Sequence, residues 1–207
     1  METLIDRKCA FYLVVELSRR LSAKDCDELR QVFRDFVRES RMDPHALETL
    51  WISVVEGACT ASVSLPLTSL VDLGDTMVFT NREPVETSLA SLLRAVSGRI
   101  TQEITIRTAT PKGDYRPVVL LLLAGPPPDE DQAINELNQL AKQPSNPIVL
   151  MATTSDLSFS EPFCQCLLDS PLRADLITGD MIYRAWSYYA PCGVFWDSWS
   201  PPTSKLP

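Results

Sequence analysis

The sequence predicts an α/β fold in which helices cover both faces of a mostly parallel central sheet, the doubly wound arrangement. Strongly apolar runs, each short enough to be a strand, occur at residues 9–16, 118–125 and 146–154. Between them lie longer segments in which apolar residues recur at helical spacing. Strands that alternate with helices in this way pair in parallel, and the resulting sheet is buried on both faces.

The first elements follow from their residue patterns. The run 9–16 is apolar almost throughout, which is typical of a central strand covered on both sides. After Ser22, a candidate helix cap, the spacing of the apolar residues predicts an amphipathic helix over 23–39. This helix would pack on the sheet through Leu29, Val32, Phe33, Phe36 and Val37.

The next segment contains few regular elements. The polar stretch 41–50 is predicted to be a connection interrupted by Pro44. Two short strands are predicted around Gly57, as a hairpin or a bulged pair within 50–68. An irregular polar segment over 72–86 leads to the next helix.

The second half of the chain repeats the alternation of helix and strand. A helix is predicted from Thr87 to about residue 106, and residues 111–117 form a turn punctuated by Pro, Gly and Asp. The run 118–125 is the most apolar strand, so we place it at the centre of the sheet. The remaining predicted elements are a helix over 129–142, a strand over 146–154, a helix or helical turn over 161–169, an edge strand over 174–179 and a helix over 180–190.

Composition limits the function classes. A chain of 207 residues suits one domain, residues 1–190, followed by a tail rich in proline and aromatic residues, 191–207. The net charge of −8 disfavours a nucleic-acid surface. Although Arg19 and Arg20 are adjacent, acidic residues follow them closely, which is typical of a solvated helix start.

Neither a membrane nor a metal cofactor is predicted. The N-terminus lacks the pattern of a secretory signal, and the longest apolar runs are too short to cross a bilayer, so a cytoplasmic protein is expected. The six cysteines are scattered and do not resemble a disulfide framework. Cys164 and Cys166 are separated by one residue, which is unlike the usual zinc spacing, and the chain has a single histidine.

No catalytic constellation is evident, so the protein is not expected to be an enzyme. His45 is the sole histidine, and no nucleophile motif accompanies it. The three prolines at 126–128 remove the backbone N–H groups that a phosphate loop needs. The acidic run Asp129, Glu130 and Asp131 is interpreted as favouring a helix dipole and not as a metal cluster.

Four stretches together resemble a known family. They are YLVVELSRRLS, the segment from RMDPHALETL through SLPLTSL, ETSLASLLRAV, and KGDYRPVVLLLLAGPPPDED. In this order they are similar to the von Willebrand factor A domain, and most similar to the TerY-like branch associated with tellurite resistance. The resemblance covers about residues 10–190 and implies the von Willebrand A form of the α/β fold.

The resemblance also implies a degenerate form of that family's metal-ion-dependent adhesion site (MIDAS). In the family, oxygen ligands from three loops at the carboxyl edge of the sheet hold Mg²⁺. Two of those ligands are kept here as Ser18 and Thr87, whereas Glu16 replaces one aspartate, Arg20 a serine and Ala124 the second aspartate. One carboxylate is therefore lost and one guanidinium gained, so a metal-free site is expected.

The predicted partner-binding residues are Glu16, Ser18, Arg20, Thr87, Gly125, Trp196 and Trp199. Arg20 either pairs with Glu16, pairs with a carboxylate of the partner, or is a solvated residue in a decayed loop; these alternatives stay open. Trp196 and Trp199 in the tail either fold back over the sheet or anchor a partner.

The sequence thus indicates a non-catalytic protein–protein interaction module or adaptor. The resemblance implies a bacterial stress or conflict system, in which the partner is kinase-like, phosphatase-like or another von Willebrand A domain. Two alternatives remain: an immunity protein that neutralises a basic toxin, for which an acidic chain would suit, and an adaptor whose site still depends on metal.

Overall fold

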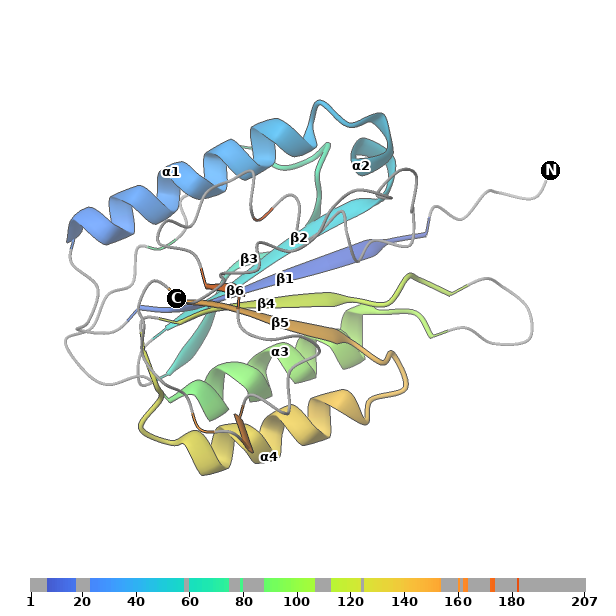
Figure 1. Ribbon diagram of the computed structural model, residues 1–207. Helices are drawn as coiled ribbons and strands as arrows, with labels where there is room; N and C mark the ends of the chain where they lie inside the picture. The colour runs from blue at the N-terminus through green and yellow to red at the C-terminus, as the bar shows by residue number, and fades with distance from the viewer. Residues whose placement is uncertain are drawn as a thin grey trace, which may run out of the picture.

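The computed structural model describes residues 7–17, 23–57, 60–74, 79, 88–106, 113–123, 125–153, 160, 162–163, 172–173 and 182. Helix α1 covers one face of a central sheet, and α3 and α4 cover the other (Figure 1). The predicted doubly wound α/β fold is confirmed. The strands are β1 (Cys9–Glu16), β2 (Leu50–Gly57), β3 (Ala61–Ser69), β4 (Val118–Leu123), β5 (Ile148–Thr153) and β6 (Leu172–Arg173); the helices are α1 (Ala23–Ser40), α2 (Pro44–Thr49), α3 (Leu89–Glu103) and α4 (Glu130–Ala141).

The strand order in the described sheet is β3-β2-β1-β4-β5-β6. All neighbouring pairs are parallel except β2 and β3, which form the predicted hairpin with shifts in register. β1 and β4 are the two central strands, as expected for the most apolar segments. The chain leaves β1 toward β2 on one side and later returns to β4 on the other side, so the switch in strand order lies between β1 and β4.

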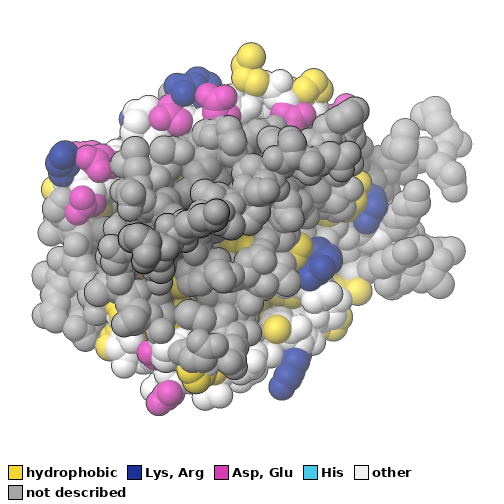
Figure 2. Space-filling view, in the orientation of Figure 1, with side chains coloured by type: hydrophobic (Ala, Val, Ile, Leu, Met, Phe, Trp, Pro, Cys, Tyr) yellow, Lys and Arg dark blue, Asp and Glu magenta, His cyan; other side chains and the backbone are white. Residues whose placement is uncertain are grey.

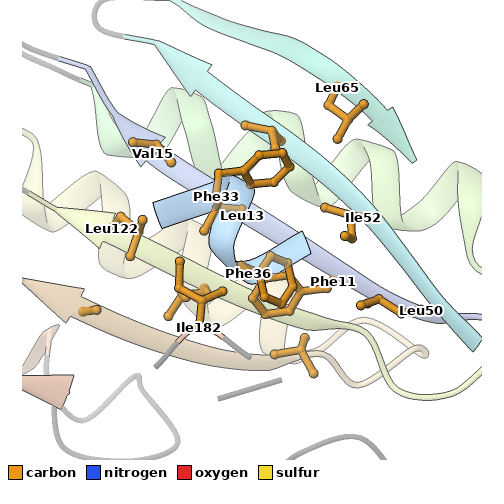
Figure 3. Close-up of a cluster of buried hydrophobic side chains, with 14 of the residues drawn as sticks. Phe11, Leu13, Val15, Phe33, Phe36, Leu50, Ile52, Leu65, Leu122 and Ile182 are labelled. Carbon is orange, nitrogen blue, oxygen red and sulfur yellow. The ribbon is translucent and has the colours of Figure 1, made fainter. Parts of the chain in front are cut away.

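Two apolar cores lie on opposite faces of the sheet because successive side chains of a strand point to opposite sides. Phe11, Leu13 and Val15 of β1 face α1 and are packed against its Phe33 and Phe36 (Figure 3). The alternate residues of β1, Ala10, Tyr12 and Val14, face α3 and α4. The apolar residues of these strands are buried on both sides, which leaves their ends as the places for polar groups.

The structure corrects the predicted bounds of two elements. Residues 44–49, predicted to be part of a broken connection, form α2, because Pro44 occupies the first helical turn and Asp43 accepts a bond from the N–H of His45 at 2.9 Å. The third helix ends at Glu103 and not near residue 106. A short edge strand lies at Leu172–Arg173, whereas the predicted strand 174–179 lies outside the described residues and stays a prediction. The tail 191–207 also lies outside them.

The surface of α1 carries both charge signs. Basic and acidic side chains alternate over this helix at the top of the space-filling view (Figure 2). Three ion pairs join neighbouring turns: Lys24 with Glu28, Arg30 with Asp27, and Arg38 with Asp35. The pattern agrees with the predicted amphipathic helix, whose polar side faces solvent, whereas Arg19 and Arg20 lie outside the described residues. Among the helices that the structure describes, none is long and apolar enough to cross a membrane.

Asp114 fastens the amino edge of the sheet. Its carboxylate accepts the N–H of Lys8 at 3.0 Å and the N–H of Thr105 at 2.8 Å. The N–H of Tyr115 bonds to the carbonyl of Lys8 at 2.9 Å. The turn before β4 is therefore joined both to the start of β1 and to the residues that follow α3, which explains why a short polar Gly-Asp-aromatic segment stands between apolar elements.

Tyr12 places a hydroxyl inside the core between β1 and α3. Its side chain is fully buried, and its O–H donates to Glu103 at 3.0 Å. Burial is the main cause that raises the pKa of Tyr12 above its usual range, and the charge of Glu103 adds to it. The folded state thus holds this phenol in its neutral form.

The substitution Tyr12→Phe tests this arrangement. At neutral pH the loss of the bond to Glu103 is expected to lower the free energy of unfolding by about 1 kcal/mol. Because the folded pKa is raised, the stability contributed by neutral Tyr12 is complete below the ordinary tyrosine pKa of about 10 and is lost as the pH rises above it. The difference between the proteins should therefore narrow between about pH 10 and 11 in urea unfolding. A difference that stays constant across that interval would contradict the assignment.

Candidate functional site

The candidate site lies at the carboxyl edge of the sheet, where α1, α3 and α4 also begin (left side of Figure 1). Glu16 is the last residue of β1 and is only 2% exposed, and the buried Gly125 follows β4 closely. Because β1 and β4 are adjacent and parallel, these two predicted residues end at the same edge, at the switch point. Ser18, Arg20, Thr87, Ala124, Trp196 and Trp199 lie outside the described residues, so what was expected of them stays a prediction.

A second buried glutamate lies near the end of the neighbouring strand. Val-Val-Glu closes β1, whereas in β2 the same three residues are followed by Gly57, the last residue of that strand, and Glu56 is 0% exposed. The register pairs Glu56 with Val15 and Glu16 with Gly57, so the two carboxylates are offset by one residue. Residues paired in a parallel sheet share a face, so Glu16 lies on the α3 side and Glu56 on the α1 side. The two acids cannot act together on one ligand.

Glu56 binds the backbone of Phe79, a residue that lies between β3 and α3 in the chain. Its carboxylate accepts the N–H of Phe79 at 2.5 Å, and Arg30 of α1 donates to the carbonyl of Phe79 at 3.1 Å. The Phe79 ring is buried and meets Phe33 edge-on, with ring centroids 5.9 Å apart. Sequence reasoning missed this contact. A carboxylate inside an otherwise apolar strand was the available signal, but its partner is 23 residues away.

Asp129 closes the N-terminus of α3. Its two carboxylate oxygens accept the O–H of Ser88 at 2.8 Å and the N–H groups of Leu89 at 3.1 Å and Ala90 at 3.0 Å. The Oγ of Ser88 in turn accepts the N–H of Ser91 at 3.1 Å. The N–H groups that begin a helix lack partners within it. In α3, groups of the protein itself supply those partners, so this terminus is already occupied by an internal anion.

The other two acids of the run 129–131 behave differently from each other. Glu130 accepts the N–H of Ser160 at 3.0 Å, which ties the start of α4 to the segment after β5. Asp131 is exposed to solvent. All three lie at the start of α4, where negative charge is favourable, as the sequence predicted. Their contacts add a joining role for Asp129 and Glu130 that the sequence did not reveal.

Metal-binding side chains do not cluster in the described part of the chain. No three or more His, Cys, Asp or Glu residues there are arranged to hold a metal ion. His45 lies in α2, which leads directly into the start of β2, so it stands at the opposite edge from Glu16. The metal-free site and the absence of catalysis stay predictions.

Comparison with solved structures shows the fold. Pilus adhesin SpaC from Lactobacillus rhamnosus GG aligns with a TM-score of 0.64 and 11% identity, covering 88% of this chain and 30% of that one. Proximal thread matrix protein 1 from the mussel byssus gives 0.61 and 15%, covering 89% and 47%. A von Willebrand factor type A protein from Catenulispora acidiphila gives 0.59 and 12%, covering 88% and 42%.

The chain has the von Willebrand factor A fold. It spans less than half the length of each of these three neighbours. At 11–15% identity the likeness concerns the fold alone. No protein-family model matches the sequence, and no curated protein matches it. The A-type fold agrees with the resemblance in the sequence, whereas membership of the TerY-like branch stays a prediction.

Gly57 offers a test of how tightly this edge is built. A Cβ placed on Gly57 would lie 2.1 Å from the backbone oxygen of Thr60, whereas one placed on Gly98 of α3 would meet nothing within 4 Å. Gly57→Ala is therefore expected to lower the free energy of unfolding by about 1–3 kcal/mol. Gly98→Ala should raise it by roughly 0.5–1 kcal/mol, because alanine is the better helix former. Urea unfolding of both variants measures this; a neutral Gly57→Ala would contradict the close approach.

Proposed function

We propose that this von Willebrand A-type chain is a non-catalytic protein-binding module, and that it docks a partner protein at the carboxyl edge through a metal-free adhesion site. The observation that carries the proposal is the placement of Glu16. It ends a central strand at the switch point, beside the tip of β4, which is where ligands meet open α/β sheets. The loop residues Ser18, Arg20 and Thr87, with Gly125, would complete the docking edge.

The charge balance supports a site without metal. Mg²⁺ loses its water reluctantly and needs oxygen ligands in near-octahedral geometry. Glu16 is one carboxylate at the proposed site, and Glu56 cannot supply a second because it lies on the other face and engages Phe79. At position 124 the sequence has alanine, and Arg20 adds a positive charge. A guanidinium can bind a partner's carboxylate through two parallel hydrogen bonds, and so could take the place of a metal ion in that contact.

The fold supports a binding role. SpaC is a pilus adhesin, and adhesion is a binding function. The bacterial stress or conflict setting, and a kinase-like or phosphatase-like partner, are proposed from the sequence resemblance to the TerY-like branch. An immunity protein remains a second candidate, for which the net charge of −8 is the favouring observation, since an acidic chain would steer a basic toxin.

Charge reversal at the proposed edge tests the function. Tagged full-length protein would be used to recover its partner, and the purified partner would then be titrated against wild type, Arg20→Glu and Lys142→Glu. We expect Arg20→Glu to weaken binding by about tenfold or more through repulsion of the partner's carboxylate. Lys142→Glu makes the same charge change at the end of α4, and little effect is expected there.

Metal removal completes this test. Binding of the recovered partner should change less than about twofold in EDTA, and calorimetry with Mg²⁺ or Mn²⁺ alone should show no micromolar binding. Equal effects of Arg20→Glu and Lys142→Glu would place the interface elsewhere. Loss of binding in EDTA, restored by Mg²⁺, would favour the metal-dependent adaptor instead.

A further inference from the structure

We propose that Asp129 and Glu130 are positioning residues that fix the shape of the docking edge before a partner binds. The inference rests on the proposed function, because it concerns the same edge. It concerns three places on the α3 side of the sheet: the start of α3, the residues between β4 and α4, and Ser160, which follows β5 in the chain. In this proposal the two acids join these loops directly, and no metal ion is needed to hold them together.

The first argument is that Asp129 does not do what its own position predicts. An aspartate just before a helix usually accepts an N–H from the first turn of that helix. Asp129 precedes α4 directly, at φ −107° and ψ 38°, yet its side chain makes no such bond. Its carboxylate turns instead to Ser88, Leu89 and Ala90, about 40 residues earlier in the chain. Asp129 therefore does not cap its own helix, α4, and instead caps α3.

The second argument concerns what those bonds immobilise. A carboxylate that accepts several N–H and O–H donors forms charge-assisted bonds, which are stronger than neutral ones. The bonds fix the first turn of α3 relative to the segment that follows β4. Thr87, a predicted binding residue, is joined to Ser88 by one peptide bond. The point from which that loop leaves α3 is therefore set by Asp129.

The third argument is that Asp129 is not needed to keep the two helices together. Further along them, Arg94 of α3 bonds to Glu136 of α4 at 2.6 Å, and Gln143 donates to Ser97 at 2.7 Å. The buried leucines of both helices also pack in one apolar core. Loss of the Asp129 contacts should consequently loosen the first turn of α3 and leave the packing of the fold intact. Glu130 acts in the same way on Ser160, whereas Asp131 is exposed.

Amide hydrogen exchange in the free, full-length protein tests the inference without a partner. Asp129→Asn, Glu130→Gln and Asp131→Asn each remove one negative charge from the same helix start, so Asp131→Asn is the matched control. In Asp129→Asn the amides of Leu89 and Ala90 should exchange about tenfold faster than in the control. The asparagine side chain has one acceptor oxygen where aspartate has two, so it cannot accept all of these bonds. Glu130→Gln should accelerate the amide of Ser160.

The same experiment distinguishes a positioning role from a purely structural one. In β1 and β4, the amides that exchange through local fluctuations should match those of Asp131→Asn. The free energy of unfolding in urea should fall by no more than the roughly 1.4 kcal/mol that a tenfold change at Leu89 and Ala90 represents. A uniform acceleration across all elements, or unchanged exchange at Leu89 and Ala90, would overturn the proposal. Ser88→Ala is the second variant: combined with Asp129→Asn it should add much less than its separate effect, since both changes remove the same contact.

Binding to the partner recovered by wild type gives the last measurement. Asp129→Asn should slow association by about threefold or more, because the edge is no longer preorganised, while Asp131→Asn should not. Equal association rates for these two variants would overturn the positioning role. If Arg20→Glu binds the partner as well as wild type does, the proposed docking site is contradicted. The contacts of Asp129 would still be supported if its exchange result is as expected. The two failures are therefore separable.

Discussion

Burial of the central strands on both faces is the constraint on which the rest of the structure depends. β1 and β4 are apolar from end to end except where Glu16 closes β1, because α1 covers one side and α3 and α4 cover the other. Such strands leave room for charged groups only at their tips. Charged side chains of the central strands are therefore found at the amino and carboxyl ends of the strands. Glu16 and Glu56 are buried charged residues because each stands at such a tip.

Two aspartates on either side of β4 hold the two ends of α3. Asp114, before the strand, accepts the N–H of Thr105 just after α3, and Asp129, after the strand, accepts the first N–H groups of α3. Both use carboxylate oxygens to satisfy backbone donors that a helix or turn leaves without partners. Because β4 is a central, buried strand, these contacts as well as the apolar face of α3 fix the position of α3 along the sheet. The residues on either side of β4 thus fix α3 at both the amino and the carboxyl edge of the sheet.

The sequence predicted the elements whose periodicity is long and strong, and it failed where a contact is distant or an element is short. The helices around Phe33 and Leu93 and the strands 9–16 and 118–125 repeat their pattern over many residues. α2 was missed because Pro44 was interpreted as a break, although proline also begins helices. The strand β6 has two residues and no period to detect. The bonds of Glu56 and Asp129 join residues 23 to 41 positions apart, which no local pattern encodes.

Under the proposed function, the contacts of Asp129 also bear on why the docking edge could do without a carboxylate at position 124. In a metal-dependent site the ion does two jobs, since it binds the partner and joins the loops that supply its ligands. Here the second job, on the α3 side, is done by a side chain that bonds directly to the first turn of the helix. Loss of the carboxylate ligand at position 124 would then abolish metal binding at the edge but leave the start of α3 in place. In the proposed site, Arg20 would then serve recognition alone, because Asp129 joins the α3 side of the edge without an ion.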